Sequence, residues 1–583
     1  LLGTREEGKE LDWKIRYDVT AELGKGSFGS VMLLRHKQNT NEVRVCKSVD
    51  TSQLSKSAIK ACLLEVNALA RLDHPHVVRL YEYSHDKANR MLYLILEAIE
   101  GGDCKKLTRR PYEPLQEQFV ARIIRHTLMA TAYCHSMGVV HRDMKPENIM
   151  LTSLDPLTFS AKVIDFGLAV VFDDGEEHVI NRRAGTVHYM APEVVNRTPF
   201  GDAADLWSIG VTTYQLLSGS VPFDGRDIPS CEQAICKNKV LFPPRLGWRA
   251  RSKAVRDFIR RLVEKDPEAR PSASDALELS WQRHHEEDVS MDKETVHQQA
   301  SGLATFQAAP QFIRATLLLT AVQLTPSDIQ EIEATFEAID IDRDGFIQAD
   351  ELRQALVARV ATPAPASAGN GYFAALANSA GEEDVYAAVD ETVGQIDMNG
   401  NGVIDFSEFV AACLYVQLAA LKRDAGGKVR QRDILRHAFE SFDANNNGRV
   451  TKPEILQRLD TPAIRRIEEQ TGADYKDVLR NLPENFDFTM DDFIEIVLQN
   501  VQDDQAKVTA KKERAERQDQ RQELTRDTSS IADDEEHEHG NLTFKESLFC
   551  FYQQKSRTVS TAVHGVTREL ESRSRKSFCC AVQ

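Results

Sequence analysis

Five short motifs follow one another in a fixed order along the first part of the chain, and they constrain its fold more than any other feature. They are GKGSFGSV from Gly24, VRVCK ending at Lys47, HRDMKPEN from His141, DFG from Asp165 and APE ending at Glu193. The glycines of the first motif let backbone amides approach phosphate groups without Cβ clashes. That motif alone is a weak signal, because a turn in any β-hairpin can supply it. The joint order and spacing of all five are very improbable by chance.

With these motifs the first half of the chain resembles a eukaryotic protein kinase. The resemblance implies an α+β bilobal domain over residues 17–283, preceded by an N-terminal extension of residues 1–16. It also implies an ATP site, in which Lys47 holds the α- and β-phosphates and Glu65 fixes Lys47. The predicted nucleotide-binding set is Leu23, Gly24, Lys25, Gly26, Ser27, Phe28, Gly29, Val31, Lys47, Glu65, Glu97 and Ala98.

The same resemblance assigns the chemistry of phosphoryl transfer, which requires neutralised charge and a nucleophile held in line. Asp143 would accept the proton of the substrate hydroxyl, and Lys145 would contact the γ-phosphate. Asn148 and Asp165 would bind Mg²⁺. A lysine two residues after the catalytic aspartate indicates a serine or threonine acceptor rather than tyrosine. The alternative is a kinase fold without activity, and the intact catalytic positions argue against it.

Two acidic residues indicate which protein substrates such a kinase takes. Asp103 and Glu147 match positions at which basophilic kinases contact arginine side chains upstream of the acceptor. We therefore expect a preference for R-x-x-S or R-x-x-T sequences. The alternative is that both carboxylates are simply solvated at the surface.

The activation segment has no serine or threonine between Asp165 and Gly185. Thr186 falls where kinases place a threonine that lines the peptide site, rather than at the usual phosphorylation site. Arg142, which pairs with a phosphate in many kinases, has acidic residues of the segment as alternative partners. These residues are Asp173, Asp174, Glu176 and Glu177. We expect activity without phosphorylation of this segment.

Three twelve-residue loops in the second half place oxygen-bearing side chains at positions 1, 3, 5 and 12 and glycine at position 6. This spacing is typical of EF-hand calcium loops, in which position 7 binds through its backbone carbonyl. The predicted calcium ligands are Asp340, Asp342, Asp344, Phe346 and Glu351, then Asp397, Asn399, Asn401, Val403 and Glu408, and then Asp443, Asn445, Asn447, Arg449 and Glu454. A β-branched residue at position 8 of each loop predicts that loops pair through short strands.

The loops differ in charge, with four, three and two candidate carboxylates in chain order, where Asp405 is the third carboxylate of the second loop. We therefore expect the third loop to bind calcium most weakly and to depend on its neighbours. A fourth, degenerate unit begins at Asn481, lacks the glycine and aligns Phe488 with position 8. We expect it to fold as a hand that pairs with the third without binding calcium.

Kinase, junction and four hands, in that order, resemble the calcium-dependent protein kinase family over about residues 17–501. The predicted parts after the kinase are a junction (284–325), an all-α calmodulin-like EF-hand domain (326–501) and a charged tail (502–583). The family resemblance implies that the junction inhibits the kinase at low calcium and that the calcium-filled hands relieve this inhibition. The apolar core of this junction has only one basic residue, Arg314. Inhibition by a basic pseudosubstrate sequence in the junction is therefore disfavoured. Hydrophobic docking, or bracing of the kinase by the calcium-loaded hands, fits better.

Composition limits the remaining possibilities. The net charge of −17 argues against nucleic acid as the main partner. Ten cysteines without a CxxC pair suggest a reducing compartment. No apolar run is long enough to span a membrane, and the first ten residues lack the apolar core of a signal peptide. We expect a cytoplasmic protein whose partners are ATP, Mg²⁺, Ca²⁺ and protein substrates.

The last residues, SRSRKSFCCAVQ, contain a possible membrane address. Cys580 and the three residues after it fit a C-a-a-X prenylation signal, and the final glutamine suggests a farnesyl group. Cys579 is a candidate for palmitoylation, and neighbouring basic residues can meet anionic lipids. The alternative is an ordinary disordered tail.

Two other functions stay open on the sequence. One is a calcium-responsive scaffold whose kinase fold only binds, which the intact Lys47, Asp143, Asn148 and Asp165 weigh against. The other is a constantly active kinase whose hands serve localisation.

Overall fold

The structure, a computed structural model, describes the kinase domain almost completely and the hands in part. The described residues are 12–26, 29–37, 42–86, 88–108, 115–156, 158–172, 179–180, 183–286, 326–357, 389–390, 392–394, 396–398, 400–420, 447–454 and 487–492, with single residues or pairs between 303 and 324 and at 439 and 443. Several sequence predictions fall outside them: Ser27, Phe28, Asp173, Asp174, Glu176, Glu177, Asn399, Asn445, Asn481, Cys579 and Cys580.

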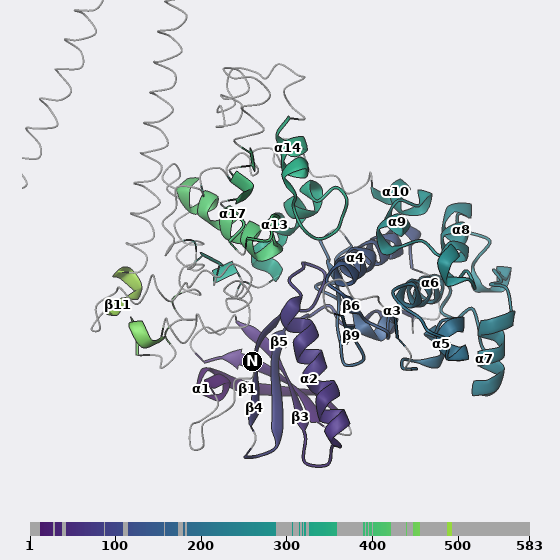
Figure 1. The fold of residues 1–583 in the computed structure, drawn as a ribbon, viewed down its shortest axis with the longest axis horizontal. Helices are drawn as coiled ribbons and strands as arrows, with labels where there is room; N and C mark the ends of the chain where they lie inside the picture. Colours follow the sequence, from purple (N-terminus) through teal and green to yellow (C-terminus); the bar gives the residue numbers. More distant parts are fainter. Residues whose placement is uncertain are drawn as a thin grey trace, which may run out of the picture. The chain divides into compact units, whose positions relative to one another are not determined.

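The first lobe is an antiparallel five-stranded sheet in the order β1-β2-β3-β5-β4, with one long helix, α2, beside it (Figure 1). Its elements are α1 (Asp12–Arg16), β1 (Tyr17–Gly26), β2 (Gly29–His36), β3 (Val43–Asp50), α2 (Lys56–Arg71), β4 (Leu80–Asp86) and β5 (Met91–Glu97). Helix α2 begins where the Ser55 side chain accepts a hydrogen bond from the Ala58 backbone N–H. Trp13 of α1 packs into the core of this lobe, so the folded part includes residues before the predicted boundary at residue 17.

Side chains along β3 alternate between the core of the lobe and the side on which the nucleotide site lies. Arg44, Cys46 and Ser48 are buried, and the residues between them are half-buried. Successive side chains of a strand point to opposite faces, so Lys47 projects away from the face that buries Cys46. The thiol of Cys46 belongs to the core of the first lobe, because its side chain is fully buried with Trp13 and Tyr17.

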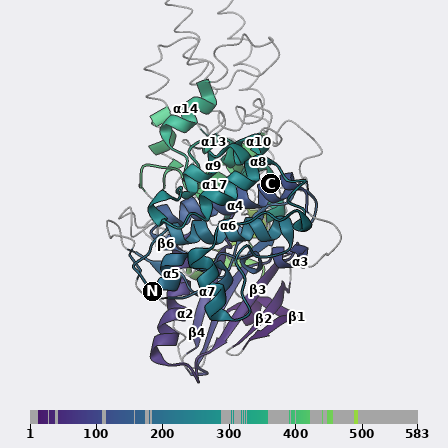
Figure 2. The ribbon, with the colours of Figure 1, turned by 90° about the vertical axis from the view of Figure 1, so that its right-hand side faces the viewer.

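The second lobe is mainly helical and surrounds the long helices α4 (Glu117–Ser136) and α6 (Ala203–Ser218), which are buried over most of their length. Figure 2 shows these helices together, away from the strands of the five-stranded sheet. Its other helices are α3 (Cys104–Thr108), α5 (Pro192–Asn196), α7 (Ile228–Lys237), α8 (Lys253–Leu262), α9 (Ala273–Leu277) and α10 (Ser280–Glu286). Short strands frame the catalytic loop: β6 (Val139–Val140) pairs with β9 (Val170–Val171), and β7 (Ile149–Leu151) pairs with β8 (Ala161–Val163). The predicted bilobal kinase fold is therefore confirmed.

The described part of the hands contains helices α13 (Pro326–Ile339), α14 (Ala349–Val357) and α17 (Phe406–Ala420) and strands β10 (Arg449–Thr451) and β11 (Asp487–Thr489). The first two calcium loops pair through an antiparallel bridge between Ile347 and Ile404. Strands β10 and β11 pair Val450 with Phe488. Both contacts join position-8 residues, as the sequence predicted, and the second joins the third loop to the degenerate fourth unit. In the described part of the chain, no helix combines the length and hydropathy needed to cross a bilayer.

Candidate active site and calcium loops

Three charged side chains from separate elements meet at the predicted nucleotide site. Lys47 Nζ of β3 donates to Glu65 Oε1 of α2 at 2.6 Å and to Asp165 Oδ1 at 3.1 Å. Burial alone lowers the pKa of Lys47, but the charges of Glu65 and Asp165 raise it above its ordinary value. Burial raises the pKa of the Asp165 carboxyl, but the charge of Lys47 brings this pKa below its usual range. Lys47 is therefore a fixed cation and Asp165 a carboxylate, which fits the phosphates and Mg²⁺ of a bound nucleotide.

Gly24 and Gly29 of the glycine-rich motif differ in the space available for a side chain. A Cβ at Gly24 would meet no atom within 4 Å, whereas a Cβ at Gly29 would lie 1.8 Å from the Ser48 carbonyl oxygen. Gly24 thus leaves open space above the site, as phosphate binding requires. Gly29 is instead needed for close pairing of β2 with β3.

The other predicted nucleotide contacts lie around this site. Leu23 and Lys25 are on the exposed surface of β1, and Val31 of β2 pairs with Lys47 of β3. At the hinge, the Glu97 side chain forms a buried ion pair with Lys162 at 3.1 Å. Glu97 and Ala98 can therefore offer adenine only their backbone groups.

The catalytic loop gathers the predicted transfer residues around Asp143, which is buried. Lys145 Nζ donates to Asp143 Oδ2, and Asn148 Nδ2 donates to the Asp143 carbonyl at 2.9 Å. Thr186 donates to Asp143 Oδ1 from both its hydroxyl, at 2.9 Å, and its backbone N–H, at 3.0 Å. The structure thus brings Asp143, Lys145 and Asn148 together and adds Thr186 of the activation segment to the group.

A buried carboxylate braces this loop from below. Asp205 of α6 accepts hydrogen bonds from the backbone N–H groups of His141 and Arg142, at 2.9 and 2.7 Å. Burial raises the pKa of Asp205, but the hydrogen bond and charge of His135 lower it below its ordinary value. Arg142 and Asp165 both have left-handed backbone angles, with φ of 72° and 63°. Such strain in non-glycine residues is typical of functional sites that surrounding contacts hold in place.

Both acidic residues predicted to meet substrate arginines already have lysine partners. Lys105 Nζ lies 2.9 Å from Glu147 Oε1, and Lys106 Nζ lies 3.4 Å from Asp103 Oδ2. These lysine partners were not predicted from the sequence, although the run CKKL after Asp103 was the available signal. A substrate arginine must displace them to reach the carboxylates.

The first calcium loop holds its acidic side chains close together. Oxygen atoms of Asp340, Asp342 and Asp344 lie within 4.8 Å of one another. Backbone N–H groups of Gly345 and Ile341 donate to Asp340 and Glu351, which fixes these carboxylates toward the loop centre. Asp340 Oδ1 is buried without a hydrogen-bond partner.

The electrostatics of this loop favour the binding of a cation. Burial, followed by the charges of Glu351, Asp344 and Asp342, raises the pKa of Asp340 to about 9. Closely packed carboxylates repel one another unless a proton or a metal ion compensates them. Oxygen ligands of this number and kind fit Ca²⁺. Phe346 has no side-chain ligand atom and can contribute only its backbone carbonyl.

The second and third loops repeat parts of this arrangement. Glu408 accepts backbone hydrogen bonds from Met398 at 2.8 Å and Asp405 at 2.9 Å. Burial and the charge of Asp405 raise the pKa of Glu408 well above its usual range. In the third loop, Asp443 accepts hydrogen bonds from the backbone N–H groups of Asn447 at 3.0 Å and Gly448 at 2.7 Å.

The remaining predicted calcium ligands lie in the same two loops. Asp397 accepts backbone hydrogen bonds in the second loop, where Asn401 Oδ1 accepts from the Val403 N–H. In the third loop, Asn447 Oδ1 accepts from the Arg449 N–H and Glu454 from Thr451. The Arg449 side chain pairs with Asp487 instead, so only its carbonyl is a candidate ligand.

Comparison with known proteins matches these sites. The protein kinase domain family matches residues 17–282, the EF-hand domain pair family residues 329–414 and the EF hand family residues 435–459. The chain is 30% identical over 474 residues to calcium-dependent protein kinase 34 of Arabidopsis thaliana, covering 80% of this chain and 81% of that relative. It is equally similar to calcium-dependent protein kinase 17 of the same organism, of which it covers 80%. The chain is a serine/threonine protein kinase that uses ATP, Mg²⁺ and Ca²⁺, and it belongs to the calcium-dependent protein kinase family.

Proposed function

We propose that calcium activates this kinase by relieving an inhibition that residues 284–325 impose at low calcium. The kinase then transfers the γ-phosphate of ATP to serine or threonine of protein substrates. The observation that carries the proposal is the coexistence of two charge arrangements in one chain. The contacts of Lys47 with Glu65 and Asp165 complete the catalytic site, while the buried, unpartnered oxygen of Asp340 leaves the first calcium loop in need of a cation.

Residue roles in transfer follow from the contacts of the catalytic loop. Asp143 is the proton acceptor, because its carboxylate is held by Lys145 and Thr186 at the site where a substrate hydroxyl would enter. Lys47 holds phosphate oxygens, and Asn148 and Asp165 are the residues that would hold Mg²⁺. Bound Mg²⁺ neutralises charge on the transferred phosphoryl group.

Hydrophobic contacts support the junction as the regulatory element. Its described apolar residues are all buried: Leu303, Phe306, Leu317, Leu318, Ala321 and Leu324. Phe306 packs edge-on against Tyr415 of α17, with ring centroids 5.5 Å apart. This contact favours a junction that binds the hands through apolar side chains, consistent with the scarcity of basic residues for a pseudosubstrate.

A preference for upstream arginine is the proposed substrate specificity. It rests on Glu147, which lies in the catalytic loop, and on Asp103, which forms a β-bridge with Met150 just after that loop. Their ion pairs with Lys106 and Lys105 are partly exposed. Exposed pairs contribute only about 0–1 kcal/mol, so a substrate guanidinium can replace them. The lysines would then weaken the preference without removing it.

We also propose a cytoplasmic location with membrane association through lipid on Cys580 and Cys579. This rests on the C-a-a-X sequence at the end of the chain. Because one lipid chain binds membranes only marginally, the second cysteine and the basic residues near it would add to the anchoring. Intact mass of the protein from its native host tests this, and an unmodified Cys580 would exclude it.

The decisive test of the proposed function is phosphate transfer from ATP to an R-x-x-S peptide, with calcium and with a chelator. Activity only with calcium supports the proposal. Equal activity in both would instead favour a constantly active kinase whose hands serve localisation. Absence of activity in folded, ATP-binding protein would favour a calcium-responsive scaffold.

A further inference from the structure

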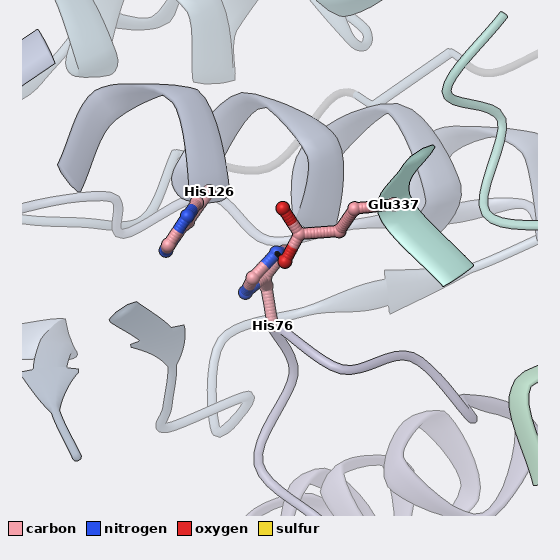
Figure 3. A group of neighbouring side chains, drawn as sticks. All are labelled: His76, His126 and Glu337. Carbon is pink, nitrogen blue, oxygen red and sulfur yellow. Dashed lines mark ion pairs between the residues drawn. The ribbon is translucent and has the colours of Figure 1, made fainter. Parts of the chain in front are cut away.

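One loop of the kinase domain, residues 72–79 between α2 and β4, contacts the regulatory parts that follow the kinase in sequence. His76 Nε2 of this loop lies 3.1 Å from Glu337 Oε1 of α13, in the first hand (Figure 3). Arg79 Nη1, at the other end of the loop, donates to the Ala321 carbonyl of the junction at 3.0 Å. We call residues 72–79 the docking loop, because it joins the catalytic part of the chain to its calcium-binding part.

The docking loop also meets the second calcium loop, beside the last predicted ligand of that loop. The Ser407 N–H donates to Asp73 Oδ2 at 3.0 Å. Ser407 immediately precedes Glu408, the predicted ligand at position 12. Ser407 also lies in the first turn of α17, where backbone N–H groups have no acceptor within the helix. The Asp73 carboxylate therefore stabilises the start of α17 through this hydrogen bond and through the helix dipole.

Arg79 extends this contact from Asp73 to the hinge of the nucleotide site. Arg79 Nη2 donates to Asp73 Oδ1 at 3.2 Å, and the guanidinium lies 5.9 Å from the centre of the Phe406 ring. The Arg79 backbone N–H donates to Glu97 Oε2 at 3.1 Å, and the Glu97 N–H donates to the Arg79 carbonyl at 3.0 Å. Glu97 is the predicted hinge residue at the adenine site. The second calcium loop and the hinge are thus connected by consecutive contacts of Ser407 with Asp73, Asp73 with Arg79, and Arg79 with Glu97.

Burial makes the central ion pair sensitive to docking. The side chains of Arg79 and Asp73 are only 14% and 9% exposed. A buried ion pair is favourable only when further hydrogen bonds satisfy its remaining donors and acceptors. The Ser407 N–H and the Ala321 carbonyl supply such bonds, and separation of the hands and junction from the kinase domain would remove both. The position of Arg79 beside the hinge therefore depends on whether the hands are docked.

We propose that Asp73 and Arg79 are positioning residues that couple calcium in the second loop to adenine at the hinge. Calcium changes the angle between the helices that flank a loop and so acts on the Ser407 contact, whereas adenine favours the hinge position that Arg79 holds. Both ligands then favour the docked state, so each raises the affinity of the chain for the other. The proposal rests on the proposed function and deepens it, because it gives a route by which calcium acts on the enzyme.

Reciprocal binding titrations on the full chain test this coupling without phosphate transfer. We would measure the Kd of AMP-PNP, a non-hydrolysable ATP analogue, by calorimetry in Mg²⁺ with either calcium or a calcium chelator. Calcium is expected to lower this Kd by about fivefold or more. In turn, AMP-PNP should shift the calcium titration, followed with a competing indicator dye, to lower calcium. Adenosine should show the same calcium dependence as AMP-PNP, because it reaches the hinge but carries no phosphates.

Variants of the two positioning residues separate coupling from a general loss of affinity. Asp73→Asn keeps the side-chain shape but removes its charge, and Arg79→Met removes the guanidinium while retaining the backbone hydrogen bonds to Glu97. Either variant should bring the ratio of the Kd values in chelator and in calcium close to one. A merely structural role would change both Kd values alike and leave their ratio as in the wild type. The control is Arg260→Met, which breaks an exposed ion pair with Asp257 on α8 and should retain the wild-type ratio.

The outcomes distinguish this proposal from the proposed function. The proposal is overturned if calcium leaves the wild-type Kd of AMP-PNP unchanged, if either variant keeps the wild-type ratio, or if adenosine shows no dependence on calcium. Coupled binding in a chain whose phosphate transfer ignores calcium would contradict the proposed function and support the proposal. Calcium-dependent transfer without coupled binding would contradict the proposal alone.

Discussion

Asp143 is the residue on which phosphate transfer depends most directly. Its carboxylate is oriented by Thr186 and Lys145, and Asp143→Asn keeps its shape but removes the base. We expect kcat to fall about 100- to 10,000-fold, the usual range for loss of a general base. ATP affinity should be unchanged, which nucleotide titration of the same variant checks. Substantial turnover by this variant would exclude Asp143 as proton acceptor.

Lys105 is expected to compete with substrate arginine for Glu147. Because an exposed ion pair contributes up to about 1 kcal/mol, Lys105→Ala should lower KM for an R-x-x-S peptide by about two- to fivefold. The matched peptide with alanine in place of arginine should show no such gain. Lys60→Ala, an exposed lysine of α2, serves as the control variant. An unchanged KM in Lys105→Ala would mean that Glu147 does not meet the substrate.

At the scale of elements, the two glycines of the β1–β2 turn should behave differently. Gly29→Ala forces a methyl group into the Ser48 carbonyl, so the first lobe should lose about 2–4 kcal/mol of stability. Gly24→Ala meets open space, so the fold should persist while KM for ATP rises. Thermal unfolding and ATP kinetics of both variants provide the measurement. Equal melting temperatures would contradict the predicted clash.

Helices α4 and α6 are joined by His135 and Asp205, at 3.1 Å, beneath the catalytic loop. Burial alone lowers the pKa of His135, but Asp205 raises it above its ordinary value. The protonated pair therefore stabilises the fold fully below the unfolded pKa of about 6.5, and this contribution is lost as pH rises through the folded pKa. We expect about 1 kcal/mol of such loss above neutral pH, absent in His135→Gln. Melting temperatures of both proteins from about pH 6 to pH 9 test the sign; parallel curves would contradict it.

The nucleotide and catalytic residues were predictable because each belongs to a short motif whose neighbours fix its conformation. Lys47, Asp143 and Asp165 lie where their motifs indicated, and the position-8 residues of the calcium loops pair as expected. Contacts made between distant segments were not predictable in this way. The run CKKL places lysines beside Asp103, but the approach of Lys105 to Glu147 depends on how α3 packs beside the catalytic loop, which the run does not specify. The meeting of His76 with α13 likewise depends on how two folded parts pack together.

For the whole molecule, regulation by calcium requires that calcium binding and catalysis be coupled. Contacts between the kinase domain and the hands include Ser407 with Asp73 and His76 with Glu337, and Phe306 of the junction contacts Tyr415 of the hands. None of these residues is a predicted catalytic residue. Coupling can then operate only through the position of the hands, since no described calcium ligand touches Lys47, Asp143 or Asp165. Loss of one calcium ligand should therefore change the calcium requirement and leave the fully activated rate unchanged.

The measurement that tests this coupling most directly is peptide phosphorylation by the full chain as a function of free calcium, for wild type and Glu351→Gln. Glu351 supplies the last ligand of the first loop, so its substitution should raise the calcium concentration for half-activation by about tenfold or more. Glu331→Gln, on the exposed side of α13, should match the wild type. We predict low activity without calcium for both proteins, and for Glu351→Gln an activation curve shifted to higher calcium with the same maximum. Activity that is equal at all calcium concentrations, or curves that coincide, would contradict control of this kinase by its hands.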